Sequence, residues 1–179
     1  EYQDRIDSLE AALSTNEQEI QSRYNELIAK ADQLYGEGNY AAALAFYDKA
    51  HNLKPAEQYP KDQMAIIQKL LDKKYTDAIT KADLLFKAKE YKKARQMYQE
   101  ALRHKPGDAY AQDMLNKTDK IISLFDKRFT SLVNEGDSLF MNKQYDPAKG
   151  KYRDALKFYP SERYPRDMIS MIENNRTAG

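Results

Sequence analysis

The sequence predicts an all-α protein, a helical-repeat solenoid of three repeats in which long and short antiparallel helices alternate. Three observations predict this class. Three segments of 25 residues align without a gap, apolar residues recur at steps of three and four, and Val, Thr and the alternating patterns typical of strands are scarce. With 32% charged residues and a mean hydropathy of -0.88, the 179-residue chain suits an elongated body better than a compact globule.

The aligned segments repeat small and aromatic residues in fixed columns. They run from Ala31 to Pro55, from Ala82 to Pro106 and from Gly136 to Pro160, at offsets of 51 and 54 residues. A bulkier side chain in the alanine column would hold two helices apart, so we expect close helix crossings there. The alanine column consists of Ala43, Ala94 and Ala148, and the proline column of Pro55, Pro106 and Pro160. Of the 14 tyrosines, only Tyr2 and Tyr159 lie outside columns that recur or that hold Phe in the other repeats.

The long helices can be assigned from spacing and from the absence of helix-breaking residues. Residues 1–35 form the first long helix, and Gly36 and Gly38 mark the turn into the short helix that follows. Residues 61–88 contain no Gly or Pro and keep a helical period, which predicts one helix of about 28 residues, or about 42 Å. Residues 109–142 behave likewise, interrupted only by Gly136 near the end, so a third long helix is predicted there.

Prolines and one aspartate set the other predicted helix ends. A proline ring has no amide hydrogen to donate, so we expect the proline column to end each short helix. In the third repeat, Asp146 is predicted as the N-cap and Pro147 as the first helical residue. Pro60 and Pro165 lie where the next helix would start.

These elements divide the chain into five segments. A single repeat cannot bury enough apolar surface to offset its ordering entropy, so we expect stability to come from stacked neighbours. The segments are residues 1–23 as an N-terminal extension of the first long helix, 24–58 as repeat 1, 59–109 as a long helix plus repeat 2, 110–163 as a long helix plus repeat 3, and 164–179 as a C-terminal helix and tail.

The segment from Ala31 to Pro55, with its small residue, its aromatic columns and its closing proline, resembles the tetratricopeptide repeat (TPR). The other two segments resemble it almost as closely. Two features depart from the family: the period is 51 to 54 residues instead of about 34, and Leu27, Ala78 and Leu132 stand where the family often has Trp. The resemblance implies stacked helix pairs that bind partner proteins on a concave wall of first helices. Similar long-period arrays are frequent in bacterial envelope proteins, so a periplasmic or envelope location is implied, with the cytoplasm as the alternative.

An acidic and an aromatic side chain recur together on the first helices. The pairs are Asp32 and Tyr35, Asp83 and Phe86, and Asp137 and Phe140. Residues three apart share a helix face, and the resemblance implies that this face lines the groove. Carboxylates and rings would suit a basic or arginine-bearing peptide, through charge-assisted hydrogen bonds and stacking. In the alternative interpretation, each aspartate bonds a neighbouring helix or a nearby lysine and each ring belongs to the core.

The predicted function is a non-catalytic scaffold for a partner protein or peptide. The alternative is a structural spacer or oligomerisation element that self-associates through its N-terminal helix. Residues spaced by seven form a seam there that is typical of a coiled coil, although packing on a neighbouring long helix would explain it as well. The seam consists of Ile6, Leu13, Ile20 and Leu27, with Leu9 at a companion position. The basic stretch from Lys87 to Lys105 suits an anionic surface or, alternatively, a solvated outer face.

Several other classes of function are disfavoured by what the sequence lacks. The 29 basic and 28 acidic residues nearly balance, so no nucleic-acid partner is expected. No apolar run is long enough for a transmembrane segment, and the start at Glu1 suits a soluble fragment or a processed chain. The two histidines, His51 and His104, have no metal-ligand spacing, Cys is absent and no phosphate-binding loop is present. We therefore expect no enzyme, no cofactor and no metal.

Overall fold

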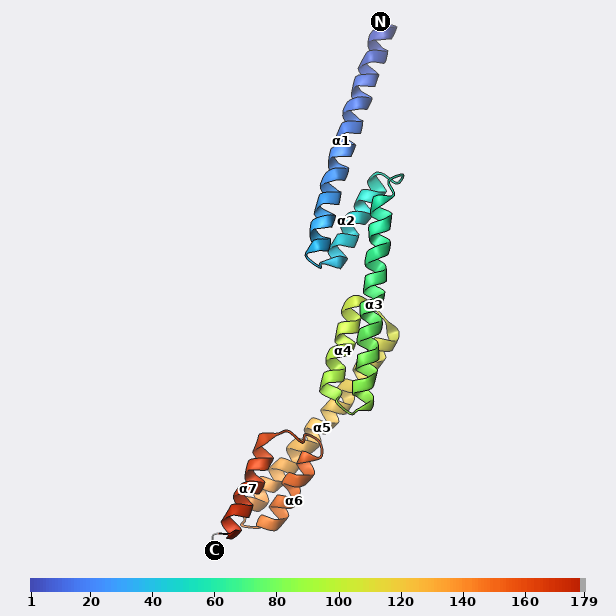
Figure 1. Cartoon of the computed structure of the whole chain (residues 1–179). Helices are drawn as coiled ribbons and strands as arrows, with labels where there is room; N and C mark the ends of the chain where they lie inside the picture. Colours follow the sequence, from blue (N-terminus) through green and yellow to red (C-terminus); the bar gives the residue numbers. More distant parts are fainter. Residues whose placement is uncertain (178–179) are drawn as a thin grey trace. The chain divides into compact units, whose positions relative to one another are not determined.

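Helices account for all regular structure in the part of the chain that the computed structural model describes, which is residues 1–177, with side chains through Asn174. Seven helices follow one another in this range and pack as sequential antiparallel pairs (Figure 1). The helices are α1 (Tyr2–Gly36), α2 (Tyr40–Leu53), α3 (Tyr59–Lys87), α4 (Tyr91–His104), α5 (Ala109–Met141), α6 (Tyr145–Leu156) and α7 (Arg163–Thr177). The predicted all-α class with alternating long and short helices is confirmed.

The chain divides into two units, and α3 runs from the first into the second. The first unit comprises Glu1–Tyr75 and holds α1, α2 and the start of α3. Its core joins these three helices through buried residues, and Met64 and Leu71 of α3 pack against them. The buried core residues are Ala31, Leu34, Ala43, Tyr47 and Ile67. Residues 1–19 of α1 are all exposed, so only the C-terminal half of this helix takes part in the core.

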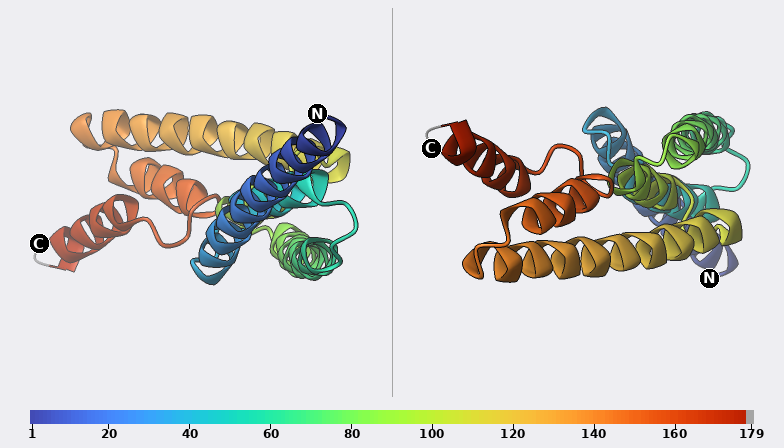
Figure 2. Two further views of the ribbon diagram at one scale, coloured as in Figure 1. Left: turned by 90° about the horizontal axis from the view of Figure 1, so that it is seen from above. Right: turned by 90° about the horizontal axis from the view of Figure 1, so that it is seen from below.

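The second unit begins at Thr76 and repeats the same packing twice. The end of α3 packs on α4 through Ala82, Ala94 and Tyr98. In the next pair, Ala148 and Tyr152 of α6 form a core with Met168 and Ile172 of α7. Helix α6 lies between α5 and α7, as both views of Figure 2 show. Each helix pair therefore buries its apolar face against the helix that follows it.

Alanines and tyrosines of the repeat columns form the centre of each pair. The alanines of the column, Ala43, Ala94 and Ala148, are 0% exposed, and so are Tyr47, Tyr98 and Tyr152, which follow them by one helical turn. A methyl side chain lets the two helix backbones approach, and the large ring then fills the space beside it. The same small-then-large arrangement thus recurs in all three repeats.

The turn between the long and the short helix has the same backbone in all three repeats. Its central residue has a positive φ: 77° at Gly38, 61° at Lys89 and 61° at Lys143. In each turn this residue donates to a carbonyl three residues back, and the next residue donates to a carbonyl five residues back. This is the Schellman motif that ends a helix in the left-handed region, where glycine is favoured. Two of the three turns use lysine instead.

Two predicted helix ends in the third repeat are wrong. Asp146 is not an N-cap: α6 begins at Tyr145 with Gln144 as its N-cap, because the Schellman turn fixes the start of the short helix at the same place in every repeat. Pro147 is the third helical residue, where no amide hydrogen is needed. Nor does Pro160 end α6, which stops at Leu156, because Lys157 and Phe158 each donate to the carbonyl three residues back and tighten the last turn.

None of the described helices combines the length and the apolar character that crossing a membrane requires.

Candidate functional site

Each predicted aspartate forms a hydrogen-bonded cluster with two tyrosines of the helices that follow it. We call these the Asp–Tyr clusters. They consist of Asp32 with Tyr47 and Tyr59, Asp83 with Tyr98 and Tyr110, and Asp137 with Tyr152 and Tyr164. In every cluster the tyrosines follow the aspartate by 15 and 27 residues. The cluster is therefore a property of the repeat, built three times from the same columns.

Both phenols of a cluster donate to one carboxylate oxygen, Oδ1. In the second cluster, the Tyr98 and Tyr110 hydroxyls lie 2.7 and 2.9 Å from Oδ1 of Asp83. The corresponding distances are 2.5 and 2.9 Å at Asp32, and 2.7 and 2.8 Å at Asp137. Oδ2 of each aspartate accepts no hydrogen bond from the described residues. Oδ1 thus links three helices through hydrogen bonds, whereas Oδ2 remains available as an acceptor.

The three members of a cluster differ in exposure. The inner tyrosine, such as Tyr98, is 0% exposed, whereas the outer tyrosine, such as Tyr110, is 48% exposed. Asp32 is exposed, and Asp83 and Asp137 are partly buried. Each cluster therefore presents a carboxylate oxygen and a half-exposed phenol ring to solvent, and the buried phenol anchors the carboxylate.

Burial keeps the inner phenols protonated. Desolvation, followed by the hydrogen bond to the adjacent aspartate, raises the pKa of Tyr47, Tyr98 and Tyr152 well above the ordinary value of 10.0. At neutral pH these hydroxyls are donors to a charged acceptor, a geometry that strengthens a hydrogen bond. A phenol held in its protonated form beside a carboxylate positions that carboxylate and supplies no base or nucleophile of its own.

The aromatic members of the predicted pairs make different contacts from the aspartates. Their rings lie against the first residue of the short helix: Tyr35 against Tyr40, Phe86 against Tyr91, and Phe140 against Tyr145, with centroids 5.9, 5.3 and 5.4 Å apart. All three are partly buried. These rings close the turn between the helices of a pair, and the outer tyrosine is the ring beside the carboxylate instead.

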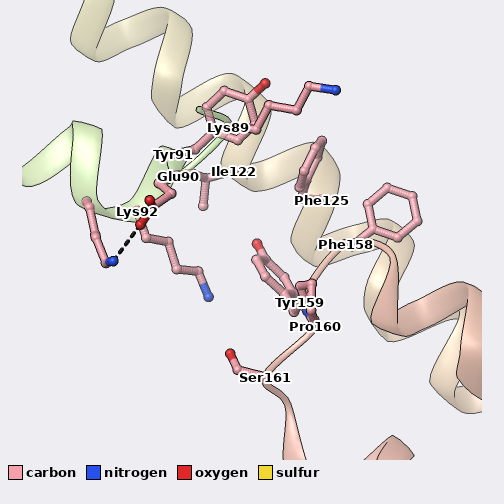
Figure 3. A pocket seen from close by; sticks show the side chains of 11 residues that line it. Lys89, Glu90, Tyr91, Lys92, Ile122, Phe125, Phe158, Tyr159, Pro160 and Ser161 are labelled. Carbon is pink, nitrogen blue, oxygen red and sulfur yellow. Dashed lines mark ion pairs between the residues drawn. The ribbon is translucent and has the colours of Figure 1, made fainter. Parts of the chain in front are cut away.

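A pocket with aromatic walls lies within the second unit, between the turn that precedes α4 and the segment that follows α6. We call it the aromatic pocket (Figure 3). Its volume is about 340 Å³, and α5 forms its floor with Ile122 and Phe125. The lining residues are Lys89, Glu90, Tyr91, Lys92, Lys93, Ile122, Phe125, Phe158, Tyr159, Pro160 and Ser161.

The walls of the aromatic pocket are fixed by ring contacts and by one short hydrogen bond. Phe125 meets Tyr91, Phe158 and Tyr159 edge-on, with centroids 5.4, 5.1 and 6.4 Å apart. The Tyr159 hydroxyl donates to Asp126 at 2.5 Å. Edge-to-face contacts of this kind favour one arrangement of the rings. The pocket is therefore a shaped feature of the second unit.

Sequence reasoning missed the aromatic pocket, although one signal pointed to it. Tyr159 lies outside the repeat columns, and the residues equivalent to Phe158 and Tyr159 one repeat earlier are His104 and Lys105. A ring that breaks a repeat pattern is free of the packing role shared by the other rings. Its partners, Phe125 and Phe129, come from the helix that carries three extra residues.

Among the described residues, no group of three or more His, Cys, Asp or Glu side chains lies close enough together to bind a metal ion. The two histidines have separate surroundings. Nε2 of His104 lies 2.9 Å from Glu100, and the buried Nδ1 of His51 has no hydrogen-bond partner among the described residues.

Comparison with known proteins finds likenesses among solved structures. No protein-family model and no curated protein sequence matches the chain. Among solved structures the chain is similar to YrrB, described as a TPR protein with an unusual peptide-binding site, at 18% identity and a TM-score of 0.23, covering 84% of this chain and 76% of that one. The sequential antiparallel pairs and their threefold buried alanine–tyrosine centre make the described chain an all-α, TPR-like helical repeat.

Proposed function

We propose that the chain is a non-catalytic scaffold that binds an arginine-bearing segment of a partner protein through its Asp–Tyr clusters. TPR-like folds generally mediate protein binding, with repeated side chains as the contacts. The observation that carries the proposal is the open oxygen of each cluster: two phenols occupy Oδ1, and Oδ2 accepts nothing from the described residues.

The chemistry of a cluster suits a guanidinium group. Arginine presents planar, paired N–H donors that fit a carboxylate and a flat face that stacks on aromatic rings. In the second cluster, Oδ2 of Asp83 would accept from the guanidinium, and the half-exposed ring of Tyr110 would offer the stacking surface. A lysine ammonium offers neither the planar fork nor the flat face, so discrimination of arginine from lysine is expected.

Repetition of the cluster favours an extended partner over a single side chain. The second unit holds two complete clusters, at Asp83 and Asp137. A partner that places an arginine at each would bind the second one intramolecularly, at a high effective concentration. Affinity would then fall by much more than half when either cluster is lost.

Calorimetric titration with two synthetic peptides tests this proposal. One peptide carries two arginines in a Gly/Ser background, and the other carries lysines in their place. We expect saturable binding of the arginine peptide to the full chain, loss of about tenfold or more in the Asp83→Asn, Asp137→Asn double variant, and weaker binding of the lysine peptide. Asparagine keeps an oxygen for the phenols and removes the charge.

The matched control for this titration is the Asp77→Asn, Asp113→Asn double variant. It removes the same two charges from exposed positions of the same two helices, α3 and α5. Binding that falls equally in both double variants, or that does not distinguish arginine from lysine, would mean attraction by net charge and would refute the role of the clusters.

A second candidate function, self-association through the N-terminal helix, is favoured by the exposed seam on α1. Ile6, Leu9 and Leu13 are 45%, 68% and 64% exposed. Leu13 and Ile20 are the repeat equivalents of Met64 and Leu71, which pack against the core of the preceding helix pair. This stretch of α1 therefore carries a packing face without a neighbour in the described residues.

Sedimentation velocity over a range of concentrations tests the second candidate. Dimers that form with the full chain and disappear when residues 1–23 are deleted would support it, because the deletion leaves Tyr24 and the rest of the buried half of α1 in place. A monomer at all concentrations would refute it.

A further inference from the structure

We propose that the aromatic pocket is a docking site for an acidic peptide segment that inserts one aromatic side chain. This site goes beyond the proposed function, because it uses other residues and prefers the opposite charge. It lies wholly within the second unit, and its occupant follows from three features: preformed walls, size and charge.

The walls of the pocket are in place without a ligand. Tyr159 is held by its hydrogen bond to Asp126 and by ring contact with Phe129, 5.4 Å between centroids. Phe125 is held at the same time by Tyr91 and by Phe158. The four rings that line the pocket, those of Tyr91, Phe125, Phe158 and Tyr159, are only partly buried, so they keep surface that an inserted group can contact. A preformed apolar site loses little conformational entropy when it is filled.

The size of the pocket selects a side chain over a larger element. A volume of about 340 Å³ is at the lower end of the roughly 300 to 1,000 Å³ typical of ligand sites. It admits an aromatic ring together with a little adjacent backbone, and it excludes a helix. Edge-on contact with the rings of the wall would orient a phenyl group, which a flexible aliphatic chain would not match.

The rim of the pocket is basic. Three lysines and one glutamate line it, and Lys93 is already paired with Glu90 at 2.5 Å. Lys92 lies over the Tyr159 ring at 4.1 Å and only 3.9 Å from Asp126, whose Oδ1 also accepts the Tyr159 hydroxyl. Lys89 forms no ion pair with any described residue. The ammonium group of Lys89 is thus available to a carboxylate that flanks an inserted ring, and Lys92 would serve a second carboxylate in exchange for its longer contact with Asp126.

The surrounding surface extends this preference. From Lys87 to Lys105 the chain carries seven basic and two acidic residues. Complementary charge raises the association rate and selects against basic segments, while the inserted ring supplies the anchor. The occupant is therefore an acidic segment with one aromatic anchor. An acidic segment without an aromatic side chain is not expected to bind.

Fluorescence anisotropy with labelled peptides tests the proposal on the full chain. The probe is a capped peptide of Asp, Glu and Gly with one central Phe, compared with the same peptide carrying Ala for Phe and with one carrying Lys for the acidic residues. We expect saturable binding of the probe alone, weakened about tenfold or more by the Lys89→Gln, Lys92→Gln double variant. The Lys127→Gln, Lys143→Gln variant removes two exposed lysines away from the pocket and should bind as the original chain does.

Circular dichroism checks that each variant keeps its helices. Four results would overturn the proposal. Equal binding of the Ala peptide would mean charge attraction without an anchor. Phenylacetate that displaces the probe at equal concentration would mean a small-molecule site. Retention on phosphatidylserine vesicles that is lost in the Lys89→Gln, Lys92→Gln variant, with no effect on peptide, would mean a membrane surface. No saturable binding of any peptide up to millimolar concentration would mean an empty pocket.

Discussion

Gly136 of α5 lies directly against the ring of Tyr152 of α6. A Cβ atom at residue 136 would be 2.7 Å from Cε1 of that ring and 2.9 Å from Cδ1. The same column holds Ala31 and Ala82 in the other two repeats. The third helix pair therefore has room only for glycine at a point where the other two pairs hold a methyl group.

Substitution of Gly136 by Ala should destabilise the second unit despite the better helix propensity of alanine. Alanine gains about 1 kcal/mol in a helix interior, whereas overpacking against a fully buried ring costs about 1 to 3 kcal/mol. We expect a net loss of about 1 kcal/mol in urea unfolding followed by circular dichroism. Ala82→Gly, the converse change one repeat earlier, should also destabilise, and a stabilised Gly136→Ala variant would contradict the packing described.

Substitution of Lys143 by Gly should stabilise the chain. Lys143 has a φ of 61°, a conformation that costs a residue with a Cβ about 1 kcal/mol and costs glycine almost nothing. The greater freedom of glycine in the unfolded state offsets part of this gain, so we expect an increase of about 0.5 kcal/mol in the free energy of unfolding. Gly38→Ala in the equivalent turn should have the opposite sign, and the same sign for both variants would exclude backbone strain as the cause.

The repeated parts of the fold could be predicted because the same columns occur three times in the sequence. The recurrence of Ala43, Tyr47 and their equivalents is enough to predict that these residues are buried where two helices cross, and all of them are 0% exposed. The start of α6 could not be predicted in the same way, since Asp146 and Pro147 are good initiators by residue type. The hydrogen bond from the Gln144 amide to the Leu139 carbonyl sets the start of α6. This bond belongs to a Schellman turn, which is usually recognised by a glycine at the position that Lys143 occupies here.

The candidate site was predictable in part. The recurrence of Asp32, Asp83 and Asp137 identified the carboxylates, but their donors lie 15 and 27 residues away on other helices, so the sequence left open whether they face a partner or the fold. In the structure, Oδ1 of each aspartate accepts hydrogen bonds from two tyrosines of the fold, and Oδ2 accepts none from the described residues. The aromatic pocket could not be predicted as a site, because Phe125, Phe158 and Tyr159 have no Phe or Tyr at the equivalent positions of the other repeats and meet Tyr91 only after the helices have packed.

The Asp83 cluster should respond unequally to loss of its acceptor and loss of its inner donor. Asp83→Ala leaves the buried hydroxyl of Tyr98 without a partner, which costs about 1 to 3 kcal/mol, whereas Tyr98→Phe removes the donor and leaves a carboxylate that water can reach. We expect the loss of unfolding free energy to be larger for Asp83→Ala than for Tyr98→Phe, with Asp83→Asn between them. The reverse order would show that the phenol is solvated.

Stability should fall steeply at alkaline pH. The pKa values of Tyr47, Tyr98 and Tyr152 are raised above 10.0 in the fold, first by burial and then by the neighbouring aspartates. Above about pH 10 the unfolded chain releases these protons while the folded chain keeps them, so the folded state loses stability as pH rises and is unaffected below that range. Urea unfolding between pH 8 and pH 11 measures the effect.

The control for this pH dependence is the Tyr98→Phe, Tyr152→Phe double variant, in which the decline should be shallower. Absorbance of tyrosinate near 295 nm should lag behind that of the urea-unfolded chain. Ionisation of every tyrosine with an ordinary pKa while the helices remain intact would contradict the buried clusters.

The most direct test of the proposed function observes the aspartate carboxylates during titration with the arginine peptide. Carbon-detected NMR of the full chain reports the side-chain carboxyl of each aspartate. We expect the signals of Asp83 and Asp137 to shift together with the amides around Tyr110 and Tyr164, and we expect the lysine peptide to leave them in place. Shifts confined to the acidic residues 1–23, with Asp83 and Asp137 unchanged, would contradict it.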